Sequence, residues 1–125
     1  MKSITTSNAP GAIGPYSQGM VSAKLVFTSG QIPLDPKTGA IAGYTIEAQS
    51  EQALKNLQAV LEAGGASLQT VIKTTCFLAD MGDFAAFNAV YAKYFTGDCP
   101  ARSCVAVKTL PKNVLVEVEA IAEAL

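Results

Sequence analysis

Arg102 is the side chain of this sequence best suited to bind an anion. It lies in the stretch Pro100-Ala-Arg-Ser-Cys-Val105, at the start of a predicted strand, and no acidic residue stands directly beside it. A guanidinium group can bind a carboxylate through two parallel hydrogen bonds, each worth about 1.5–3 kcal/mol. The spacing leaves two alternatives open: a surface arginine, or one paired with Glu117 or Glu119 in a buried salt bridge.

Glu117 and Glu119 are the carboxylates that could work with Arg102. They alternate with apolar residues, so both project from one face of the last predicted strand. A solvated strand edge is the alternative. If the last two strands form a hairpin symmetric about Pro111, Arg102 lies on the face opposite both glutamates. It would then meet Glu117 only through a bulge or across two subunits.

Hydroxyl, amide and thiol groups supply the remaining candidates. Tyr16 and Ser29 carry hydroxyls beside glycines such as Gly30, which allow close backbone approach, although most such residues only form turns. Asn88 lies within a predicted aromatic helix, where an amide needs a partner. Cys104 has no neighbour in sequence that would lower its pKa, so we expect it to pack rather than to act as a nucleophile.

Several classes of chemistry are excluded by residues that the sequence lacks. It contains no histidine, which removes Ser-His and Cys-His catalytic pairs, and its three cysteines form no zinc-binding pattern. No glycine-rich loop for a dinucleotide or a nucleoside triphosphate is found. The formal charge of −1 is unlike that of a nucleic-acid-binding protein. We therefore expect neither a cofactor nor a metal ion, and no nucleic acid partner.

Hydrophobic periodicity predicts the elements that must position these residues. The order β-β-α-β-α-β-β indicates an α+β fold with two helices on one face of a mixed sheet. The first helix ends at Gly64-Gly65, and Asp80 or Asp83 accepts the first amide hydrogen bonds of the second. The predicted strands are Gly19–Val21, Leu25–Ser29, Val71–Leu78, Ala101–Lys108 and Val114–Ala122, and the predicted helices are Thr45–Ala63 and the segment from Phe84 to about Thr96.

Composition indicates a single domain over residues 1–125 that associates with copies of itself. Hydrophobic residues make up 50% of the chain and charged residues 15%, against about 25% charged in an average soluble domain. The second face of the sheet is therefore expected to meet another copy. No apolar run approaches the roughly 20 residues of a membrane span, so we expect a soluble, cytoplasmic protein.

Several motifs, in order along nearly the whole chain, resemble the Rid family (RidA/YjgF) of reactive intermediate deaminases. Arg102 is the residue that marks the imine-deaminating branch of this family. Asn88 and its aromatic neighbours also fit. The other matching stretches are Ile13-Gly-Pro-Tyr-Ser-Gln18, Thr28-Ser-Gly-Gln-Ile-Pro33, Val71-Ile-Lys-Thr-Thr75, Pro100-Ala-Arg-Ser-Cys104 and Val116-Glu-Val-Glu-Ala120.

The resemblance implies a chorismate-mutase-like fold and a homotrimer with three clefts between subunits. It also implies cofactor-independent hydrolysis of 2-imino acids, such as 2-iminobutanoate and 2-iminopropanoate, to 2-oxo acids and ammonia. Arg102 would hold the substrate carboxylate, and Glu117 would orient or deprotonate water. The residues expected to line the cleft are Tyr16, Ser29, Gly30, Asn88 and the backbone of Cys104.

Two other functions remain as alternatives. The cleft could capture carboxylates without catalysis, or the trimer surface could hold unfolded chains. A ribonuclease or translation-inhibitor activity is the weakest hypothesis, because the chain has no histidine and its formal charge is −1.

Overall fold

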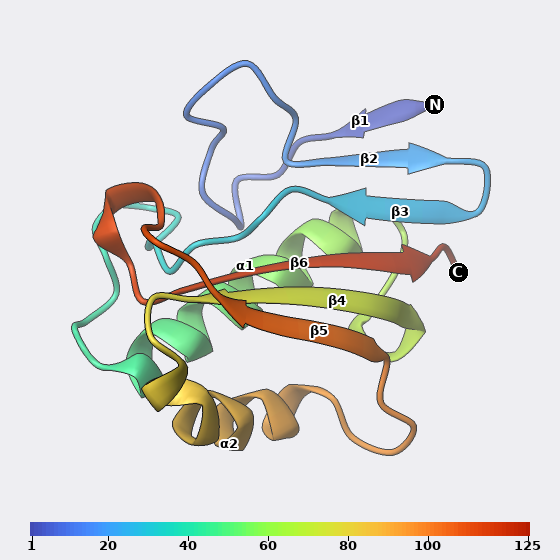
Figure 1. The fold of residues 1–125 in the computed structure, drawn as a ribbon. Coiled ribbons are helices and arrows are strands. Elements are labelled where there is room, and N and C mark those ends of the chain that lie inside the picture. The colour runs from blue at the N-terminus through green and yellow to red at the C-terminus, as the bar shows by residue number, and fades with distance from the viewer.

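Two helices lie on the same side of a six-stranded mixed sheet (Figure 1) in the computed structural model, which describes residues 1–125. The strand order is β1-β2-β3-β6-β4-β5. This architecture confirms the predicted α+β class and adds one short N-terminal strand that the periodicity did not indicate. The strands are β1 (Lys2–Ile4), β2 (Gly19–Ser22), β3 (Leu25–Thr28), β4 (Val71–Leu78), β5 (Ala101–Ala106) and β6 (Val116–Glu123), and the helices are α1 (Ile46–Ala63) and α2 (Phe84–Tyr94).

The last two strands do not form the hairpin that the sequence analysis considered. β4 lies between them: it pairs with β5 in parallel and with β6 in antiparallel orientation, which leaves β5 at the edge of the sheet (Figure 1). The physical reason is the β4-α2-β5 crossover, since a strand-helix-strand unit places its two strands parallel. The connection after β5 then carries Leu110 and Val114 into a small apolar cluster with Ile32 and Leu34 instead of closing a tight turn.

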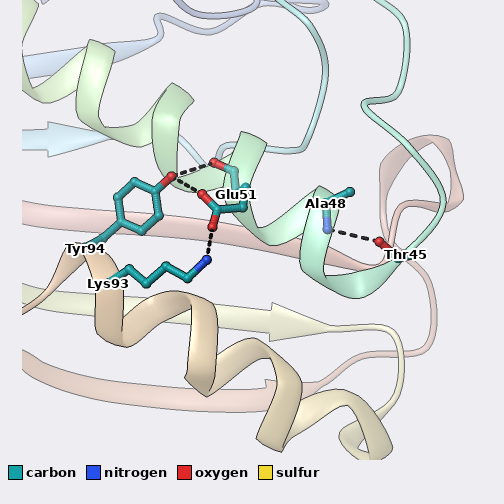
Figure 2. Close-up of polar contacts among 5 residues, drawn as sticks. All are labelled: Thr45, Ala48, Glu51, Lys93 and Tyr94. Carbon is teal, nitrogen blue, oxygen red and sulfur yellow. Dashed lines mark hydrogen bonds and ion pairs between the residues drawn. The ribbon is translucent and has the colours of Figure 1, made fainter.

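Helix α1 forms as its apolar periodicity predicts. Leu54, Leu57 and Leu61 are fully buried against the sheet, within a core cluster of 22 residues. Thr45 caps the first turn, because its hydroxyl accepts a hydrogen bond from the amide of Ala48 at 3.1 Å (Figure 2). The helix therefore has the predicted limits, with Thr45 as its capping residue.

Helix α2 begins after a short 3-10 turn, Met81–Asp83. Asp80 accepts a hydrogen bond from the amide of Gly82 at 2.7 Å and so starts this turn, whereas Asp83 makes no capping bond with its side chain. The helix ends at Tyr94, two residues before the predicted limit, because Phe95 has extended backbone angles. The buried ring of Phe95 packs into the core, with its centroid 4.5 Å from that of the Tyr91 ring.

A polar cluster fastens α2 to α1. Glu51 on α1 accepts hydrogen bonds from the ammonium of Lys93, at 2.7 Å, and from the hydroxyl of Tyr94 (Figure 2). These two bonds, that of Lys93 first, hold the pKa of Glu51 below its ordinary value of 4.5. Burial and the same contact with Glu51 raise the pKa of Tyr94. The cluster joins the last turn of α2 to α1.

We expect Glu51→Gln to destabilise the fold in a pH-dependent way. The glutamine still accepts a bond from Tyr94, so the change removes only the charge. Because the pKa of Glu51 is lowered in the folded chain, its contribution is present above pH 4.5 and is lost as the pH falls through the folded value. Denaturant titrations should show the parent more stable by about 0.5–1 kcal/mol at neutral pH, with no difference in strong acid. An equal difference at both pH values would contradict this account.

The face of the sheet away from the helices, here called the open face, carries alternate side chains of the strands. Glu117, Phe77 and Val105 are register partners across β6, β4 and β5. Phe27 and Val105 are respectively 39% and 47% exposed, so apolar surface on this face is left uncovered within one chain. None of the helices combines the length and apolar character that crossing a membrane requires.

Candidate active site

Four of the predicted site residues line one cavity of about 300 Å³. Tyr16 comes from the loop before β2, Ser29 and Gly30 directly follow β3, and Glu117 comes from β6. We call this space the glutamate cavity. Its lining is Ile13, Tyr16, Ser29, Gly30, Ile32, Pro111 and Glu117, so apolar walls surround a single carboxylate.

Gly30 lies directly against the carboxylate of Glu117. A Cβ atom at this position would stand 1.9 Å from Oε2 of Glu117, which no side chain can occupy without moving the carboxylate. The close approach is enforced by the next residue, because Gln31 and Val118 exchange backbone hydrogen bonds of 2.8 and 3.1 Å. Because glycine has no side chain, position 30 leaves room for the carboxylate of Glu117.

The carboxyl group of Glu117 is half-buried and lacks an internal counter-ion. Burial first, and then the neighbouring charge of Glu119, raise the pKa of Glu117 above its ordinary value. The only ion pair of the chain joins Lys93 on α2 to Glu51 on α1, and neither residue lines this cavity. A carboxyl with a raised pKa exchanges protons more readily near neutral pH than an exposed one.

The two hydroxyls of the cavity are partly engaged. Ser29 donates to the backbone carbonyl of Ser17 at 2.6 Å, so its oxygen remains able to accept. Tyr16 accepts a bond from the amide of Ile13 at 3.2 Å, so its hydroxyl proton remains able to donate. The cavity thus offers one free donor and one free acceptor beside the carboxylate.

Arg102 lies elsewhere, at the edge strand β5 and on the helix side of the sheet. Its guanidinium donates to Oδ1 of Asn88 on α2 at 2.8 Å. The guanidinium carbon lies 4.8 Å from the ring centroid of Tyr91 and 5.4 Å from that of Phe84. All three partners are uncharged, so the alternative of a buried salt bridge with Glu117 or Glu119 is wrong. Arg102 is a partly buried side chain at the edge of the sheet.

Cys104 follows Arg102 on the same face of β5 and packs against the core. Burial raises the pKa of its thiol, and the positive charge of Arg102 only partly opposes this effect. The group therefore remains a protonated thiol at neutral pH and is a poor nucleophile. No group of three or more histidine, cysteine or carboxylate side chains gathers in a way that could hold a metal ion.

The structure divides the predicted site residues into two groups on opposite faces of the sheet. Arg102, Thr74 and Ala120 are register partners, whereas Glu117 is the partner of Phe77, three residues further along β4. An odd separation along a strand reverses the face. The deduction that Arg102 faces away from both glutamates is therefore correct, although it was drawn from a hairpin that does not form.

Sequence reasoning missed the residues that support each group. Gln31 ties the chain beside Gly30 to β6, and no local pattern marks that long-range pairing. The sequence placed Tyr91 only within the predicted aromatic helix from Phe84 to about Thr96. Its spacing from Phe84 and Asn88, at i, i+4 and i+7, is the signal that places all three on one face of α2.

The fold and its two groups of polar side chains define a class of small α+β proteins. The family model described as Endoribonuclease L-PSP matches residues 6–124. The chain therefore belongs to this family, which is the RidA/YjgF family indicated by the sequence motifs.

Individual relatives in this family carry different names. A protein of Salmonella typhimurium named 2-iminobutanoate/2-iminopropanoate deaminase is 52% identical, with 97% of this chain and 96% of the relative covered. One from Lactococcus lactis, named as a regulator (AldR), is 54% identical, with 98% of each covered. The crystal structure of Escherichia coli TdcF with bound serine superposes with a TM-score of 0.95 at 46% identity and covers all of both chains.

Proposed function

We propose that this protein hydrolyses small 2-imino acids to 2-oxo acids and ammonia. The observation that carries the proposal is the guanidinium of Arg102, which is held by uncharged groups alone and so keeps its full charge for an external anion. A guanidinium prefers a planar carboxylate, the group that every 2-imino acid carries. The deaminase name of the Salmonella relative and the serine bound to TdcF support a ligand of this kind.

Glu117 would act as the general base and then as the general acid. Water attacks the carbon of the protonated imine and gives a proton to the Glu117 carboxylate, which forms a neutral carbinolamine. Glu117 returns this proton to the amino nitrogen. The carbon–nitrogen bond then breaks and releases ammonia, and the hydroxyl passes its proton to the Glu117 carboxylate as the carbonyl forms. The ammonia takes up this proton and departs as ammonium, which leaves Glu117 ionised again. The imine carbon is already electrophilic, so a positioned water and one proton carrier suffice.

The complete site requires two subunits. Because Arg102 and Glu117 face opposite sides of one sheet, no small substrate can touch both within one chain. A homotrimer in which the edge strand β5 of one subunit meets the glutamate cavity of the next would join them. Each trimer would then hold three equivalent sites, and the apolar part of the open face would be buried between copies.

The chain offers a direct test because Arg102 is its only arginine. We expect the parent protein to accelerate 2-oxobutanoate formation when a pyridoxal-phosphate dehydratase releases the imine from threonine. Phenylglyoxal, which modifies arginine, should abolish this acceleration, and 2-oxobutanoate should protect against the reagent. Activity that survives complete modification of Arg102, or a parent protein with no acceleration, would refute the proposed function.

An endoribonuclease activity, which the family model's description names, is less well supported by the site. The chain has a formal charge of −1, no histidine and one arginine, whereas RNA binding depends on basic groups that neutralise phosphates. RNA cleavage that persists in Arg102→Ala and Glu117→Gln would come from another part of the surface or from a contaminant.

A further inference from the structure

The ring of Tyr91 is the nearer of the two aromatic rings beside the guanidinium of Arg102. Its centroid lies 4.8 Å from the guanidinium carbon, closer than that of Phe84. Asn88 adds one hydrogen bond. An arginine that binds a carboxylate with both of its parallel donors must be held in one plane, and an aromatic face holds such a plane without neutralising its charge.

Tyr91 is itself fixed in place. Its hydroxyl shares a hydrogen bond of 2.8 Å with the hydroxyl of Thr74, and this bond is buried. Phe87 and Phe95 pack on the same ring, with centroids at 5.6 and 4.5 Å. The position of Thr74 matters because it is the register partner of Arg102 on the adjacent strand.

The contacts therefore connect Arg102 to the core by two routes. One is the β4–β5 pairing of Thr74 with Arg102, and the other runs from Thr74 through the Tyr91 ring to the guanidinium. Burial raises the pKa of Tyr91, so the ring remains an uncharged phenol and does not become a counter-ion of Arg102. The side chains that contact Arg102 carry no negative charge, so a carboxylate ligand does not have to displace an internal anion from the guanidinium.

We propose that Tyr91, anchored by Thr74, is a positioning residue that orients the Arg102 guanidinium for a carboxylate ligand. Neither residue touches the substrate. The inference rests on the proposed function, because only an anionic ligand makes this orientation useful. Loss of the ring should weaken binding of substrate and transition state alike, and so raise KM with little change in kcat.

The single arginine allows the inference to be tested without enzyme activity. Arg102 gives the only arginine Nε–Hε resonance of the protein, so no assignment is needed. In the parent this resonance should lie upfield, because the guanidinium lies over an aromatic ring. In Tyr91→Leu it should move toward the position of free arginine, and in Tyr91→Phe it should stay upfield.

The same resonance reports ligand binding during titration with 2-oxobutanoate. We expect about tenfold weaker binding and an equal rise in KM for Tyr91→Leu. Tyr91→Phe and Thr74→Val lose the bond between Thr74 and Tyr91 and should bind about threefold more weakly than the parent. Tyr94→Leu is the matched control: it removes a tyrosine from the same helix that bonds to Glu51 instead, so binding should not change. If Tyr91→Leu does not fold, the affinities of Thr74→Val and Tyr94→Leu for 2-oxobutanoate are compared instead, and only Thr74→Val should bind more weakly than the parent.

The two hypotheses fail in different ways. A parent resonance that ignores both 2-oxobutanoate and the imine would overturn the proposed function, whatever its chemical shift. A Tyr91→Leu variant that binds 2-oxobutanoate as tightly as the parent would overturn the positioning role alone. A Tyr94→Leu variant that loses as much affinity as Tyr91→Leu would do the same. Where Tyr91→Leu does not fold, so would a Thr74→Val variant that binds as tightly as Tyr94→Leu.

Discussion

Hybrid trimers of Arg102→Ala and Glu117→Gln chains should recover about one third of the parent activity, because a cyclic trimer with both kinds of chain has one complete site of three. Each variant alone should lose activity by at least about a hundredfold, since two charged hydrogen bonds or the proton carrier are missing. The expected recovery follows from the opposite faces on which the two side chains lie. Hybrids can be isolated by co-expression with two different tags.

The control for these hybrids pairs Arg102→Ala with the double variant Arg102→Ala/Glu117→Gln, which can form no complete site. Hybrids of the two single variants that remain as inactive as this control would show that both residues must come from one chain. Recovery of about one half would instead indicate a dimer with two shared sites. The measured fraction therefore reports the assembly as well as the division of the site.

Gly30→Ala should lower kcat by about a hundredfold while KM and the melting temperature change little. The new methyl group would take the place of Oε2 of Glu117, and the flexible carboxylate would turn away at small cost to the fold. Misplacement of a reacting group by about 1 Å commonly costs a factor of this size. In the proposed assembly the substrate carboxylate is held by the Arg102 of the neighbouring subunit, which Gly30→Ala does not remove, so substrate binding should persist.

Gly11→Ala is the matched control for this substitution. A Cβ atom at Gly11 would meet nothing within 4 Å, so both activity and stability should remain those of the parent. Steady-state kinetics and thermal unfolding of the three proteins make the comparison. If Gly30→Ala hydrolyses imines as fast as Gly11→Ala, the position of the Glu117 carboxylate does not govern the reaction.

Local periodicity predicted the elements of the fold well because each has a clear apolar face. The leucines of α1 recur with helical spacing, and all of those on the sheet side are fully buried. The partner of β5 could not be predicted in the same way. Strand pairing depends on the crossover through α2 and on the burial of Leu110 and Val114, which are long-range effects.

The candidate site was predictable only in part for the same reason. Arg102 and Glu117 stand out by residue type and by motif, but their separation on opposite faces emerges from the register of three strands. The roles of Gln31 and Tyr91 depend on contacts between segments distant in the sequence. A buried tyrosine looks like any other core residue until its neighbours are known.

The edge position of β5 has a consequence for the solubility of the chain. One side of this strand has no partner within the fold, and exposed strand edges are starting points for aggregation. Pro100 precedes the strand and Arg102 places a charge at its second position; both are features that discourage indiscriminate strand addition. The residue that would hold the ligand therefore also places a charge at the unpaired strand edge. We expect Arg102→Ala to make the chain more prone to aggregate as well as to lose ligand binding.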